Sequence, residues 1–146
     1  MNAALALLRR LLRNRAGTST LEFALIGPTL IFLMIAVLQI GLAMHSYNAI
    51  RNVAADTARF AVVRYQRGQA PTPAALETQA QAIATNAPYL LKSDAFAVDV
   101  EDAAVQRVDG AQEMTLTLTY TIPSVLPFAR WTSVSIDFSR PIFVLT

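Results

Sequence analysis

The chain has 146 residues, of which 54% are hydrophobic and 15% charged, and its mean hydropathy of +0.41 is high for a water-soluble domain. It contains no cysteine, so no disulfide can brace the fold. Four of its twelve basic residues lie in residues 1–17, which leaves eight basic against ten acidic residues elsewhere. This balance argues against nucleic acid as a partner of the chain beyond that stretch.

The N-terminal region combines a basic stretch with a long apolar run. Residues 1–17 contain Arg9, Arg10, Arg13 and Arg15 and no acid, and residues 23–44 contain no ionisable group. About 20 apolar residues in a helix span the hydrocarbon core of a bilayer, so the run predicts a transmembrane helix that contacts membrane lipid. The arginines before it predict a cytoplasmic N-terminus and an exported C-terminal part.

Beyond the apolar run the pattern stays helical but becomes one-sided. Residues with small or apolar side chains recur at spacings of three and four, at Ile50, Val53, Ala54, Thr57, Ala58, Ala61 and Val62. Gly68 and Pro71 end this pattern, so one long helix is expected from Leu21 to Gln66. Within it, Gln39 and Gly41 fit either a helix-pairing contact or, for Gln39, a place near the far membrane interface.

The C-terminal half predicts a second short helix and a small sheet. Residues 74–86 are rich in good helix formers, and Pro88 closes them. Alternation then predicts a strand at 114–122, a partner at 96–100 and a third strand at 134–138, with a fourth expected at 142–145 after Pro141. Asp109-Gly110 predicts a turn. The expected fold is therefore α+β, with three or four antiparallel strands whose apolar face receives the long helix.

A glycine and a carboxylate flank the start of the apolar run. Gly17 lies on its basic side, whereas an ordinary secretory signal is cleaved beyond its apolar region. Cleavage after Gly17 would leave the helix attached to the exported part, with Thr18 as its first residue and Glu22 as its fifth. The arrangement resembles the type IV prepilin signal. Together with L-E-F-A-L-I-G-P at 21–28 and R-N-V-A-A-D-T-A-R-F-A-V-V at 51–63, it resembles the TadE-like minor pilins of the tight-adherence (Tad or Flp) pilus.

This resemblance implies a role in building a surface pilus from the bacterial inner membrane. Prepilin peptidase would cut between Gly17 and Thr18, and Glu22 would meet the N-terminal amine of a neighbouring subunit. The implied partners are other minor pilins, the major pilin and the inner-membrane assembly platform, and the implied task is pilus assembly or initiation and hence surface adhesion. The relative TadF would carry the same signal and a similar head, and residues 21–28 favour TadE.

These expectations divide the chain into four parts. A leader peptide occupies residues 1–17, a transmembrane segment 18–45, an amphipathic extension 46–67, and a small head, periplasmic or extracellular, 68–146. Pro28 removes a backbone donor inside the apolar run, and Gly27 beside it removes a side chain. The pair predicts either a flexible point of the helix or a static kink. Glu22 also fits a plain helix-start acid favoured by the helix dipole.

No residue pattern indicates catalysis or a cofactor. His45 is the single histidine and stands without a second histidine, a cysteine or a nearby acid, so no metal or catalytic constellation is predicted. No phosphate-binding loop or nucleophile motif occurs either. Two other readings remain open: an unprocessed single-pass anchor that presents a binding head, and a pseudopilin of a type II secretion system, although Thr18 stands where that family has Phe.

Overall fold

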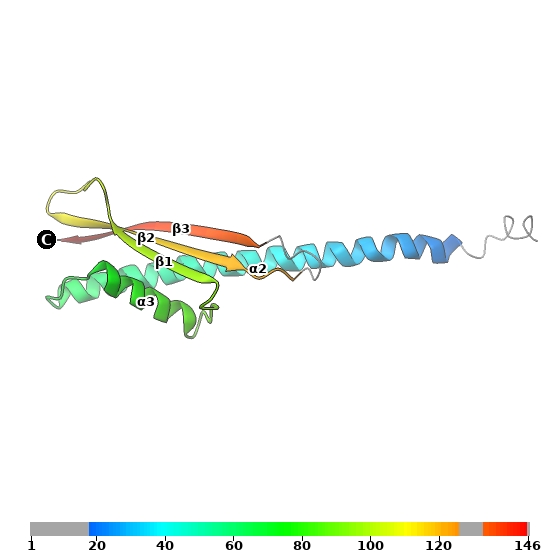
Figure 1. The fold of residues 1–146 in the computed structure, drawn as a ribbon, viewed down its shortest axis with the longest axis horizontal. Coiled ribbons are helices and arrows are strands. Elements are labelled where there is room, and N and C mark those ends of the chain that lie inside the picture. The colour runs from blue at the N-terminus through cyan, green and yellow to red at the C-terminus, as the bar shows by residue number, and fades with distance from the viewer. Residues whose placement is uncertain (1–17, 126–132, 146) are drawn as a thin grey trace, which may run out of the picture. The chain divides into compact units, whose positions relative to one another are not determined.

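The computed structural model describes residues 18–125 and 133–145, which form two helices and a three-stranded sheet (Figure 1). The helices are α2 (Thr18–Gln66) and α3 (Pro73–Thr85), and the strands are β1 (Phe96–Asp102), β2 (Ala111–Ile122) and β3 (Val134–Leu145). The predicted α+β class is thereby confirmed. The chain divides into two compact units, one ending at Leu38 and one beginning at Gln39. From here on, the head means this second unit, residues 39–146, which is larger than the segment 68–146 expected from the sequence.

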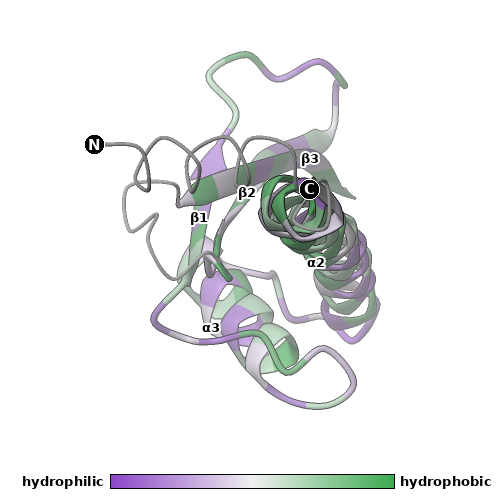
Figure 2. Cartoon of the chain, turned by 90° about the vertical axis from the view of Figure 1, so that its right-hand side faces the viewer, coloured by the Kyte–Doolittle hydropathy of each residue, from purple (hydrophilic) through white to green (hydrophobic). Residues whose placement is uncertain are grey.

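In the first unit α2 is apolar on nearly all sides from Phe23 onward. The large apolar side chains of residues 21–38 that surround Glu22 and Pro28 are exposed, and none of the described residues in this stretch is buried. Figure 2 shows the first turns of α2 coloured as hydrophobic. A water-soluble surface helix carries polar residues on one side, whereas α2 is by length and composition apolar enough to cross a membrane.

Inside the head the same helix becomes one-sided, as its sequence pattern predicted. Its buried face contains Ala49, Ile50, Val53, Ala54, Thr57 and Ala61, while Arg51 and Arg59 point to solvent. The Thr57 hydroxyl donates to the carbonyl of Val53 at 2.8 Å, which satisfies this polar group inside the core. Val62, predicted to lie on the buried face, is exposed.

The sheet is an antiparallel meander in the order β1-β2-β3. Along β2 one set of side chains is buried against the helices: Met114, Leu116, Leu118, Tyr120 and Ile122. The alternate threonines face outward, and Thr119 donates to Asp137 of β3 at 2.8 Å. Figure 2 shows α2 and α3 on the same side of the sheet. The head therefore consists of two layers with one core between them.

The two runs on either side of Pro141 form a single strand, so of the three or four strands predicted, the described residues form three. β3 runs through Pro141, which lies opposite Thr115 of β2. Because β3 is at the edge of the sheet, the missing N–H of this proline can face away from β2 without interrupting their ladder.

Helix α3 begins and ends close to its predicted limits and covers the other edge of the sheet. The Thr72 hydroxyl accepts a hydrogen bond from the Ala75 amide at 3.4 Å, and Pro73 occupies the first turn, where its missing N–H costs nothing. Its Glu77 carboxylate accepts the Val100 amide of β1 at 3.2 Å. This bond occupies a backbone donor of the β1 strand.

We expect Leu116→Ala to destabilise the head by about 2–5 kcal/mol, because it empties a fully buried site in the middle of β2. Thr115→Ala, one residue away on the outward face, is the matched control and is expected to cost less than about 1 kcal/mol. Urea unfolding of the full-length protein in detergent micelles, followed by near-UV circular dichroism, gives both values. Equal losses would contradict the assignment of the two faces.

Candidate functional site

The first candidate site is the start of α2, where a lone carboxylate stands among apolar side chains. Glu22 is exposed, and so are Leu21 and Phe23 on either side of it. Within the residues that the structure describes, no hydrogen bond or ion pair is found for Glu22. A carboxylate in such surroundings favours a cationic partner, because its transfer to hydrocarbon costs a few kcal/mol. The predicted cleavage site at Gly17 lies outside the described residues, and Thr18 belongs to α2.

Five and six residues beyond Glu22, α2 contains Gly27 and Pro28, for which the sequence predicted either a flexible point or a static kink. Pro28 lies inside the helix, so the carbonyl of Ala24 lacks its usual backbone donor. The Thr29 hydroxyl donates to the carbonyl of Leu25 at 3.3 Å, which adds a side-chain bond beside the gap. A methyl group added to Gly27 would lie 3.8 Å from the Phe23 ring, an ordinary contact. Packing within this chain therefore does not require glycine at this position.

Gln39, where the head begins, holds a loop of the head against α2. Its side-chain amide donates to the carbonyl of Pro123 at 3.5 Å, and its amide oxygen accepts the backbone N–H of Val125 at 3.1 Å. The sequence predicted that Gln39 lies at a helix pair or near the far membrane interface; the structure adds that its bonded partners are about 85 residues away in the same chain. No local pattern could have revealed them.

His45 is exposed on α2. Among the described residues, no group of three or more His, Asp or Glu side chains is placed to hold a metal ion.

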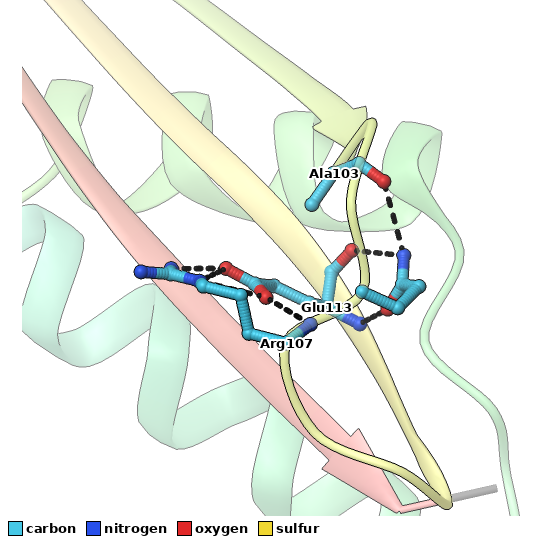
Figure 3. A network of polar contacts seen from close by, with 4 residues as sticks. Ala103, Arg107 and Glu113 are labelled. Carbon is cyan, nitrogen blue, oxygen red and sulfur yellow. Dashed lines mark hydrogen bonds and ion pairs between the residues drawn. The ribbon is translucent and has the colours of Figure 1, made fainter.

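An ion pair between a buried carboxylate and a largely exposed guanidinium, at one end of the sheet, is the second candidate site (Figure 3). The side chain of Glu113 is only 2% exposed although it lies on the outward face of β2. The guanidinium of Arg107 forms an ion pair with it, and the backbone N–H of Arg107 donates to its other oxygen at 3.2 Å. The side chain of Gln106 donates to the carbonyl of Glu113 at 3.2 Å and also to that of Ala103 at 3.1 Å.

This network shifts the pKa values of its members in the direction expected for an ion pair. Hydrogen bonding to Arg107 lowers the pKa of the Glu113 carboxyl, and burial opposes that shift only in part. Bonding to Glu113 raises the pKa of Arg107. The guanidinium also lies 5.7 Å from the centre of the Phe143 ring of β3. Within the described part of the chain, the Glu113 carboxylate is bonded to Arg107 of the loop between β1 and β2, so the pair fixes this loop.

A shallow pocket of about 170 Å³ lies between the end of α2 and β3. It is lined by Val62, Tyr65, Gln66, Phe143 and Val144. Its lining side chains are mainly apolar, and their only polar groups are a phenol and an amide, so it presents no arrangement for proton transfer or nucleophilic attack.

Comparison with known proteins identifies the N-terminal segment. Residues 17–59 match a family model described as TadE-like protein, which confirms the resemblance seen in the sequence. The matched segment contains Glu22, Pro28 and Gln39 and extends into the part of α2 that packs in the head. No curated protein sequence and no solved structure matches the chain.

We expect Glu113→Gln to lower the unfolding midpoint at pH 7, because the variant loses the charge that Arg107 pairs with. The folded-state pKa of Glu113 is lowered, so its contribution to stability is complete above the ordinary carboxyl pKa of about 4.3 and is lost as the pH falls through the folded value. The difference between wild type and variant should therefore shrink in acid.

Thermal unfolding of the full-length protein in micelles between pH 7 and pH 3 measures this difference. Glu101→Gln removes an equivalent charge from an exposed position of β1 and should leave the midpoint unchanged at pH 7. A pH-independent difference for Glu113→Gln would contradict a role for the ionised carboxylate.

Proposed function

We propose that this chain, which carries a TadE-like segment at residues 17–59, is a minor pilin of a Tad (Flp) pilus that acts in pilus assembly or initiation and hence in surface adhesion. One observation carries the proposal: the TadE-like match falls on a helix that is long and apolar enough to cross a membrane and that carries a lone carboxylate near its start. The family match itself supports the broader statement that the protein is associated with a Tad pilus.

A single membrane-spanning helix fits the anchoring that this role requires. Residues 23–38 carry almost only apolar side chains, and α2 continues from them into the head. The arginines of residues 1–17 support an orientation with the N-terminus in the cytoplasm and the head in the periplasm or outside the cell. We place the protein in the bacterial inner membrane before it enters a pilus.

Processing by prepilin peptidase after Gly17 would create the partner that Glu22 lacks. The new α-amino group of Thr18 has an ordinary pKa near 7.7–8.0 and is largely protonated at neutral pH. Within one subunit this amine and Glu22 are about one helical turn apart. Between subunits, the amine of an incoming copy can neutralise the Glu22 carboxylate of its neighbour, which removes the cost of an unpaired charge at the edge of hydrocarbon.

The chemistry of the described residues favours a structural role over an enzymatic one. Among the described residues, the carboxyl group with a shifted pKa is that of Glu113, and it is bonded to Arg107 of the neighbouring loop. The pocket near Tyr65 is lined by no group suited to catalysis. The partners we propose are prepilin peptidase, other minor pilins, the major pilin and the inner-membrane assembly platform. Gly27 and Pro28 serve as the point at which α2 adjusts when it leaves lipid for the filament.

The mature protein is expected to begin at Thr18 in cells that contain prepilin peptidase and at Met1 in cells that lack it. N-terminal sequencing and intact mass of the protein purified from both strains measure this. A Met1 start in both strains would favour an unprocessed membrane anchor that presents a binding head. A start at Thr18 combined with normal pili in a strain that lacks this chain would favour a secretion pseudopilin.

We expect Glu22→Ala to leave the protein in the membrane and processed, but to abolish or strongly reduce pilus formation, because the incoming amine loses its counter-charge. Membrane fractionation and the amount of pili sheared from cells measure the two effects. Glu101→Ala removes a carboxylate from an exposed position of the head and is the control, with normal piliation expected. Normal pili on Glu22→Ala cells would remove this residue from the assembly mechanism.

A further inference from the structure

We propose that the base of the head lies in the outer interface of the membrane that α2 crosses, so that lipid contacts the head as well as the transmembrane segment. The base of the head consists of exposed apolar residues where the head begins: Ile40, Leu42 and Met44 of α2, with Val125 and Val134 from the two sides of the β2–β3 connection. The inference rests on the membrane anchoring in the proposed function and assigns a second lipid contact to the chain.

The first argument is the number of residues that a bilayer requires. Glu22 carries a charge and therefore belongs at or outside the inner edge of the hydrocarbon, so the span begins with Phe23. A helix of about 20 residues is needed to cross, which places the outer edge of the hydrocarbon near Leu42. The head, however, begins at Gln39. The last few residues of the span thus already belong to the head.

The second argument is the way in which Gln39 is satisfied. An amide side chain in hydrocarbon must find hydrogen-bond partners within the protein, because no water is present to replace them. The Gln39 side chain bonds to the carbonyl of Pro123 and to the N–H of Val125. These bonds bring the Pro123–Val125 backbone to the level of Gln39, which the residue count places inside the outer edge of the hydrocarbon.

The third argument is the character of the side chains exposed at that level. Ile40 is 63% exposed, Val134 51% and Val125 39%, and α2 carries no arginine, lysine or acid between Glu22 and Arg51. Apolar side chains that surround a helix at the end of its membrane span are stabilised when lipid covers them, because their surface is then removed from water. Water offers no such gain, so lipid is the occupant that these residues favour.

The natural absence of cysteine permits a direct test in the full-length protein. Single cysteines are introduced as Val125→Cys, Val134→Cys, Ile31→Cys and Val105→Cys, labelled with an environment-sensitive fluorophore, and reconstituted into phosphatidylcholine–phosphatidylglycerol vesicles. Val105 is the matched control, because it is an exposed valine, at 73%, in the loop between β1 and β2 at the other end of the sheet. Ile31 reports on the transmembrane segment itself.

The probes at Val125 and Val134 are expected to emit at shorter wavelength than the probe at Val105. They should be quenched by doxyl-labelled lipid and lose quenching by iodide supplied on both sides of the membrane. The opposite result is that iodide quenches the probes at Val125 and Val134 as strongly as the probe at Val105, while doxyl lipid quenches the probe at Ile31. The head would then lie outside the membrane and this inference would fail, but the proposed membrane anchoring by α2 would stand.

Two further outcomes would also overturn the inference. Protection of Val125 and Val134 from iodide without quenching by doxyl lipid would mean that protein, such as a second copy of the chain, covers the base of the head. Iodide quenching at Ile31 would show that α2 does not span the membrane, and in that case the proposed anchoring fails together with the inference.

Discussion

A single helix in this protein must meet two different solvation requirements along its length. From Phe23 to Leu38 the side chains on every side of α2 are almost all apolar and none is buried, whereas from Ser46 onward one side is buried in the head and the other carries arginines. The backbone bonds of a helix are satisfied internally in both environments, so the same secondary structure can continue from one to the other. The change in side-chain pattern is what separates the membrane segment from the head.

The head is built around the buried side of that helix. The head has about 100 residues, which is enough for one small core. This core lies between one face of the sheet and the two helices α2 and α3. The aromatic rings of Tyr47 on α2 and Phe138 on β3 meet edge to face at 6.3 Å, and the Arg51 guanidinium lies 5.7 Å from the centre of the Tyr47 ring. The docking of the helix on β3 therefore depends on the segment that directly follows the membrane span.

The two polar contacts that fix the loops of the head act at opposite ends of the sheet. Gln39 holds the start of the β2–β3 connection, and the Arg107–Glu113 pair holds the loop between β1 and β2. In both contacts, hydrogen bonds within the protein replace the hydrogen bonds that the polar side chain would make with water. What keeps water away differs between the two. Glu113 is covered by its own loop, so water is excluded by protein, whereas at Gln39 we propose that lipid excludes it.

The sequence by itself determined the secondary structure and the chemistry of the N-terminal segment. The 22 residues without an ionisable group, the three-and-four spacing after Ile50 and the alternation from Met114 to Ile122 are local patterns, and each predicted its element because burial on one face imposes a fixed period. The TadE-like resemblance was equally local. Tertiary structure decided the remainder: that β3 runs through Pro141, that Gln39 bonds to Pro123 and Val125, and that Glu113 is buried on an outward face. These features depend on residues brought together from distant positions or on a loop folding back over a strand, and no periodicity in the sequence records such contacts.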